Sequence, residues 1–129
     1  MVFMVAPPGL ATDQEEALDA SFLISEIGKN KLRFEKKYKD KFIDVVGHVG
    51  SIEEEGKGSD KSIVIDLVGS KGRDNPFSYI SCHFSIDQLD ALLELNKRDR
   101  IIVKGVYRGS QIFEVGALSL FDCNLILTP

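Results

Sequence analysis

The sequence predicts an all-β fold with added helices, in which five strands close into a small barrel. Three stretches carry this prediction: an alternating strand over 77–84 (FSYISCHF), a short helix over 85–95 (SIDQLDALLEL) and a second strand over 100–108 (RIIVKGVYR). A helix between two strands of one small all-β unit is the plan of a five-stranded oligonucleotide/oligosaccharide-binding (OB) barrel. We therefore expect an OB barrel with a helix between strands three and four, and one extra N-terminal helix.

The helix over 85–95 begins with a capping box, because Gln88 follows Ser85 by three residues. In the strand before it, side chains alternate between two faces. Ile80, Cys82 and Phe84 form the predicted core face, and the outward set is Phe77, Tyr79, Ser81 and His83.

Three further strands complete the predicted barrel: 42–52, 62–68, and a broken strand over 111–127 with a bulge at Gly116. Gly47 and Gly50 lie where the first strand has to bend to join both halves of the sheet. The first strand repeats the pattern of the fourth, so these two are expected to pair.

Length and composition indicate one globular domain over 1–129. The chain has 43% hydrophobic residues and a net charge of −4. No apolar run approaches the roughly 20 residues that cross a bilayer. The predicted segments are an apolar arm over 1–11, a helix over 12–28, a basic linker over 29–41 and the barrel over 42–127. The arm is a poor signal peptide, because Pro7 and Pro8 interrupt it.

The helix over 12–28 has a capping box at Thr12 and Glu15 and a natural stop at Gly28. Its apolar stripe is expected to cover the barrel wall or a second copy of the chain. The basic linker has seven Lys/Arg residues against two acidic ones. Its lysines could hold phosphates while Phe34 and Tyr38 stack bases. The favoured alternative is that Leu32, Phe34 and Tyr38 anchor the segment while the lysines form a solvated face.

Candidate catalytic and metal-binding residues form no convergent set. Cys82 and His83 are adjacent in a strand, so they face opposite sides and cannot act as nucleophile and base together. His48 stands alone, and the acidic run 53–55 lacks the ligand spacing of a calcium loop. We expect a protein that is not an enzyme and needs no metal or cofactor.

The two cysteines, Cys82 and Cys123, both fall in predicted strands with apolar neighbours. Buried free thiols are favoured over a disulfide between strands three and five, because a bridge also needs an oxidising compartment. A cytoplasmic location is slightly favoured over an exported or envelope-associated one.

From about Ile24 to Leu127 the chain resembles the tRNA_anti-like family of bacterial OB-fold proteins. The residues that carry the resemblance are Asn30, Tyr38, Lys39 and Lys41; Val45, Gly47 and Val49; Cys82 and Phe84; Ile101, Val103 and Gly105; and Asp122 and Cys123. The resemblance implies kinship with anticodon-binding OB domains, in a family whose members mostly lack an established function. Many of them look exported or lipid-anchored, whereas this sequence shows no lipobox cysteine near its start.

Two binding functions remain open. The first is contact with single-stranded DNA or RNA through the outer face of strands two and three. Its candidate residues are Phe77, Tyr79, His83, Lys71, Arg73, Lys36 and Lys37. A sequence pI of 5.2 argues against it, because single-strand binders have a basic face. The second is a protein-interaction or self-associating module that uses the same aromatic residues or the N-terminal helix.

Overall fold

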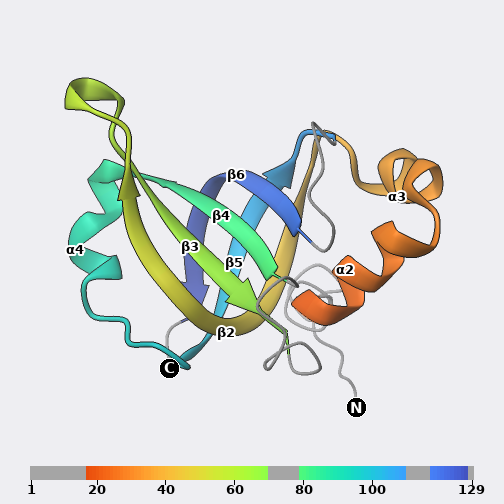
Figure 1. The fold of residues 1–129 in the computed structure, drawn as a ribbon, viewed down its shortest axis with the longest axis horizontal. Coiled ribbons are helices and arrows are strands. Elements are labelled where there is room, and N and C mark those ends of the chain that lie inside the picture. The colour runs from red at the N-terminus through yellow and green to blue at the C-terminus, as the bar shows by residue number, and fades with distance from the viewer. Residues whose placement is uncertain (1–16, 70–78, 110–116, 128–129) are drawn as a thin grey trace, which may run out of the picture.

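The computed structural model describes residues 17–69, 79–109 and 117–127 of the chain. Five strands form a closed barrel: β2 (Lys41–Glu55), β3 (Ser62–Val68), β4 (Tyr79–Ser85), β5 (Arg100–Tyr107) and β6 (Ala117–Leu127). They follow the order β2-β3-β4-β6-β5, and β5 pairs with β2 to close the barrel (Figure 1). All barrel pairings are antiparallel except β4 with β6. This confirms the predicted OB barrel and the predicted pairing of its first and fourth strands.

The long strand β2 serves both halves of the sheet. Residues 41–48 pair with β5 and residues 48–55 pair with β3, with a register shift between Val49 and Ser51. Gly50 lies at this shift, and a Cβ there would come within 3.0 Å of the Val68 side chain. The bend predicted from the glycines of the first strand is present, because the strand bulges where it passes from one partner to the other.

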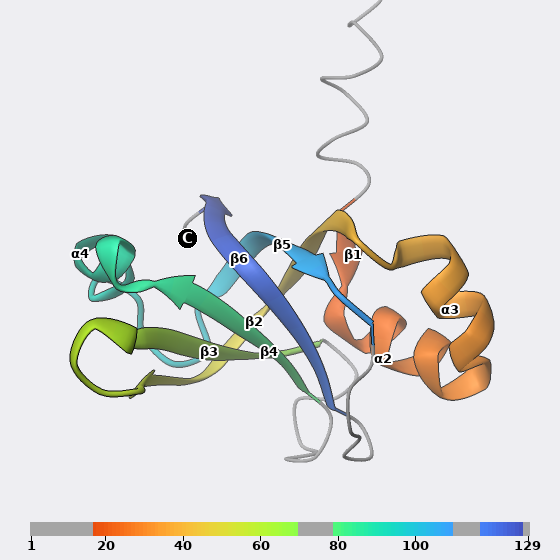
Figure 2. The same cartoon turned by 90° about the horizontal axis from the view of Figure 1, so that it is seen from above.

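Helices lie at both ends of the barrel. Helix α2 (Ala20–Lys29) covers one end, and a 3-10 turn, η2 (Ile86–Gln88), with the single turn α4 (Leu89–Leu92) covers the other (Figures 1 and 2). Ala20 and Leu23 of α2 and Leu92 of α4 are buried in the same apolar cluster as the barrel strands. No helix in the described part of the chain is long and apolar enough to span a membrane.

The N-terminal helix begins later than the sequence predicted. Leu18 and Asp19 form a two-residue strand, β1, that runs parallel to Val45 and Val46 of β2. Asp19 is extended and its carboxylate accepts a hydrogen bond from the Ser21 backbone N–H at 2.9 Å, so Asp19 is the N-cap. The predicted capping box at Thr12 and Glu15, like the arm over 1–11, lies outside the described residues.

The segment 29–41 was predicted to be a linker, and most of it is a second helix, α3 (Lys31–Tyr38). Asn30 ends α2 and also caps α3, because its side chain accepts a hydrogen bond from the Arg33 backbone N–H at 3.0 Å. Phe34 and Tyr38 are one helical turn apart, and their ring centroids lie 4.7 Å from each other. The many charged residues of this segment favoured the prediction of a linker, although the spacing of Phe34 and Tyr38 is that of a helix.

The helix between strands three and four is also shorter than predicted. The Ser85 hydroxyl accepts from the Asp87 backbone N–H at 3.2 Å, but the Gln88 side chain does not complete a capping box. It instead donates to the backbone carbonyl of Cys123 on β6 at 2.8 Å. The helical segment begins after Ser85 as predicted, and this tertiary hydrogen bond replaces only the expected local contact of Gln88.

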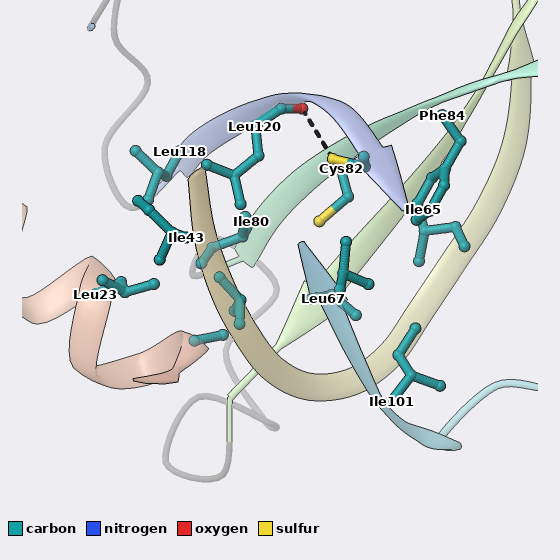
Figure 3. Packing of buried hydrophobic residues seen from close by; sticks show 14 of the residues in the cluster. Leu23, Ile43, Ile65, Leu67, Ile80, Cys82, Phe84, Ile101, Leu118 and Leu120 are labelled. Carbon is teal, nitrogen blue, oxygen red and sulfur yellow. Dashed lines mark hydrogen bonds between the residues drawn. The ribbon is translucent and has the colours of Figure 1, made fainter. Parts of the chain in front are cut away.

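The core is a single apolar cluster inside the barrel (Figure 3). Ile80, Cys82 and Phe84 of β4 are buried, as their alternation predicted. Cys82 and Cys123 are both buried free thiols, as favoured from the sequence. A hydrogen bond with Cys123, together with burial, raises the pKa of the Cys82 thiol.

Candidate nucleic-acid interface

The outer face of β4 presents Tyr79, Ser81 and His83, which are half-buried and alternate with the three buried core residues. His83 and Cys82 therefore face opposite sides of the strand, as predicted. Two of the candidate site residues, Tyr79 and His83, thus share one face of the barrel. Phe77, Lys71 and Arg73 lie outside the described residues.

A β-bulge in β6 turns two consecutive side chains toward the outer face of the barrel. Leu120 lies opposite Cys82 and Cys123 lies opposite Phe84, so β6 uses one residue more than β4 across this interval. Asp122 takes up the extra length with a φ of 51°. Leu120 and Cys123 both remain buried, while Phe121 and Asp122 both face outward.

The His83 imidazole and the Phe121 ring stack, with centroids 4.7 Å apart and planes 17° apart. The guanidinium carbon of Arg108, which follows β5, lies 5.4 Å from the Phe121 ring centroid. Arg108 also forms an ion pair with Asp122. Strands β4 and β6 and the segment after β5 thereby build a short stack of one cation and two rings, an arrangement on which a nucleic-acid base can stack.

An open pocket of about 500 Å³ adjoins this stack. Besides the stack itself, polar side chains from several elements line it: Ser62, Ser85, Gln88, Asp122 and Asn124. Asn124 is exposed, and its amide donates to the Asp122 backbone carbonyl at 3.4 Å. The pocket falls in the size range of small-molecule sites and combines rings with hydrogen-bonding groups.

Burial lowers the pKa of His83 below its ordinary value, and the nearby carboxylates of Glu55 and Asp66 act in the opposite direction. The imidazole is therefore neutral near pH 7 and acts as an aromatic ring rather than as a cation.

A row of hydrogen bonds crosses the outer face beside the stack. Asp66 of β3 lies opposite Ser51 of β2 and Ser81 of β4. Its carboxylate accepts from the Ser51 hydroxyl at 3.1 Å and from the Ser81 hydroxyl at 2.9 Å. The row ties three strands together, and it places a negative charge in the middle of the face formed by β3 and β4.

The two candidate lysines, Lys36 and Lys37, lie on α3, at the end of the barrel opposite α4, and His83 lies near the end of β4 that leads into α4 (Figure 2). The structure therefore does not bring these lysines together with His83. Phe34 is buried, with its ring 5.1 Å from that of Tyr107, so it anchors α3 and is not available for stacking a base. Leu32 was expected to be an anchor as well, but its side chain is 76% exposed.

Arg108 and Phe121 were not among the candidate residues. The sequence placed Phe121 in the fifth strand, and period-two alternation from the buried Leu118 and Leu120 would have pointed it outward. What the sequence lacked was the parallel register of β4 and β6, which decides that Phe121 meets His83. Within the described residues, no group of three His, Cys, Asp or Glu side chains is placed to hold a metal ion.

Comparison with known proteins identifies relatives of the whole fold. The tRNA_anti-like family model matches residues 6–119. The fold is similar to the crystal structure of a proposed nucleic acid-binding lipoprotein from Klebsiella pneumoniae subsp. pneumoniae, with a TM-score of 0.75 and 10% sequence identity. That similarity covers 95% of this chain and 99% of the lipoprotein chain. No curated protein sequence matches.

Proposed function

Since this chain belongs to the tRNA_anti-like family, we propose that it is a non-enzymatic module that binds single-stranded nucleic acid on the outer face of its barrel. The observation that carries the proposal is the stacked pair of His83 and Phe121. The Klebsiella lipoprotein of the same fold, itself a proposed nucleic acid-binding protein, supports the class of ligand.

The stack suits a base better than a phosphate. Every base has a π-face, and stacking on an aromatic side chain contributes about 1–3 kcal/mol per base whatever the sequence. Asp122 is paired with Arg108, and Glu55 and Asp66 lie near enough to influence His83. Because these three carboxylates offset the charge of Arg108, we expect the site to bind mainly through stacking and to respond only weakly to salt.

The position of the basic helix α3 leads to a prediction about the length of the ligand. A nucleic-acid strand that contacts both the His83 pocket and Lys36 or Lys37 has to run from one end of the barrel to the other (Figure 2). OB folds occupy about 4–16 nucleotides. A nucleic acid of about 4 nucleotides should contact the stack alone. One of about 16 nucleotides should also reach α3, and its affinity should depend more steeply on salt, by a slope of roughly 0.7 for each phosphate contact.

Fluorescence anisotropy with labelled oligonucleotides of about 4 and about 16 residues, the limits of the OB range, tests both points. Phe121→Ala should weaken binding of both oligonucleotides by about 1–3 kcal/mol, the range for one stacked base, because His83 loses the ring that holds it in the stack. The matched control is Phe42→Ala, which removes an aromatic ring that is 59% exposed on β2, outside the pocket. If wild type binds neither oligonucleotide at low salt, or if both variants bind equally, the proposal fails.

A further inference from the structure

Beyond nucleic-acid binding, we propose that copies of this chain associate head to tail. The acidic tip of the hairpin formed by β2 and β3 in one copy docks in a basic groove on α3 of the next. The hairpin tip consists of residues 52–61, and the groove is lined by Asn30, Leu32, Arg33, Lys36 and Lys37.

The basic groove is a shallow, open concavity of about 440 Å³ on the side of α3 that faces away from the barrel. Its lining is mainly cationic, with one exposed apolar side chain, Leu32. Arg33 already approaches Glu26 at 4.0 Å, but Lys36 and Lys37 form no ion pair with any residue that the structure describes. Lys37 lies 5.4 Å from the Tyr38 ring centroid, which leaves its charge without an anionic partner, so the groove has cations available for an acidic surface.

The hairpin tip has the complementary composition. Ile52 is 37% exposed and is followed by Glu53, Glu54 and Glu55, all exposed. Glu54 is paired with Lys61 at 3.5 Å, whereas Glu53 and Glu55 form no ion pair within the described ranges. Glu53 and Glu55 point to one face of β2, opposite to Ile52, so the unpaired carboxylates of one copy match the unpaired lysines of the next in charge.

The two surfaces cannot meet within one molecule. The hairpin projects from the barrel at the end where α4 lies, and α3 lies at the opposite end, in both views (Figures 1 and 2). The contact therefore joins different copies through unlike surfaces. Such a heterologous contact leaves a free hairpin at one end of the assembly and a free groove at the other, so it builds rings or open chains rather than a closed two-fold dimer.

Sedimentation velocity over a concentration series, in reducing buffer, tests this contact. The weight-average sedimentation coefficient of the wild type should rise with protein concentration at about 0.01 M salt. It should stay constant at about 1 M salt, where the screening length falls from about 30 Å to about 3 Å. The variants K36E/K37E and E53K/E55K should each remain monomeric at low salt, because each places like charges across the contact.

Mixing the two variants supplies the decisive measurement. The reversed groove of one then faces the reversed hairpin of the other, and the remaining surfaces are those of the wild type, so the mixture should regain association. Two control variants carry matched changes in net charge at positions outside the groove and outside the hairpin tip. K97E/R100E matches the lysine pair and D90K/E94K matches the glutamate pair, all four positions being exposed. Both controls should associate as the wild type does.

Three results would each overturn the proposal. The first is a wild type that stays monomeric at low salt, and the second is a mixture of the two variants that does not regain association. The third is that K36E/K37E still associates but loses affinity for the longer oligonucleotide, which would assign the groove to phosphates. Recovery in the mixture also shows that both variants are folded, so failure of either variant alone is not mistaken for support.

Discussion

Gly105 of β5 lies directly against Cys123 of β6, so closely that a Cβ on Gly105 would be 2.6 Å from the Cys123 sulfur. The same Cβ would be 2.9 Å from the Cβ of Leu120. Real Cβ atoms do not approach other atoms this closely, and one of the two strands would have to move. The absence of a side chain at Gly105 thus lets β5 and β6 pack at the point where β6 bulges.

We predict that Gly105→Ala lowers the free energy of unfolding by about 1–3 kcal/mol, the usual cost of overpacking a core. Chemical denaturation measures the loss. The control is Gly28→Ala in α2, where no atom lies within 4 Å of the added Cβ. That variant should be neutral or slightly stabilising, because alanine favours a helix. Equal stability of Gly105→Ala and wild type would show that β5 and β6 are not held as described.

The free energy of unfolding should decrease at low pH, and His83 should account for part of that decrease. Burial lowers the pKa of His83 in the folded state, so between that pKa and the unfolded value of about 6.5 the unfolded chain binds more protons. Stability should therefore be fully present above about pH 6.5 and decrease as the pH falls through the folded pKa. Urea unfolding at several pH values should show a shallower decrease in His83→Gln.

His48→Gln is the matched control for this pH dependence, because it removes the other histidine and leaves the stack of His83 and Phe121 in place. This variant should still show the decrease in the free energy of unfolding that His83 causes at low pH. An unchanged slope in His83→Gln would mean that His83 has the same pKa in the folded and unfolded states.

The carboxylate of Asp66 should stabilise the outer face of the barrel. Its two hydrogen bonds to Ser51 and Ser81 are partly buried, and a hydrogen bond to a charged group contributes about 1.5–3 kcal/mol when well shielded. Allowing for partial exposure, we expect Asp66→Ala to lower the free energy of unfolding by about 1–3 kcal/mol. Asp60→Ala, at an exposed aspartate of the hairpin tip, should change it little. A similar small effect for both variants in urea unfolding would contradict a structural role for the row.

Much of the fold was determined by local patterns in the sequence. Strand β3 has the bounds that were predicted, and the buried and outward faces of β4 follow from simple alternation. Glycines marked the bend of β2. These features depend on which side chains alternate and on backbone freedom at single positions, and both can be recognised without knowing what lies across the barrel.

Other features depended on contacts between distant segments, and these were missed or mispredicted. Gln88 bonds to the Cys123 carbonyl and so leaves its own capping box incomplete. Helix α3 is anchored by Phe34 against Tyr107, across the barrel end, although its charges suggested a linker.

The candidate site shows the same division. The sequence alone determined that His83 faces outward, because its neighbours Cys82 and Phe84 belong to the core. Only the tertiary structure decided that Phe121 and Arg108 join it. The parallel register of β4 and β6, and the bulge at Asp122, arise when the barrel closes around its core. Strands that are far apart in the chain find their register by packing their buried faces together, and no turn joins β4 to β6 to fix that register in advance.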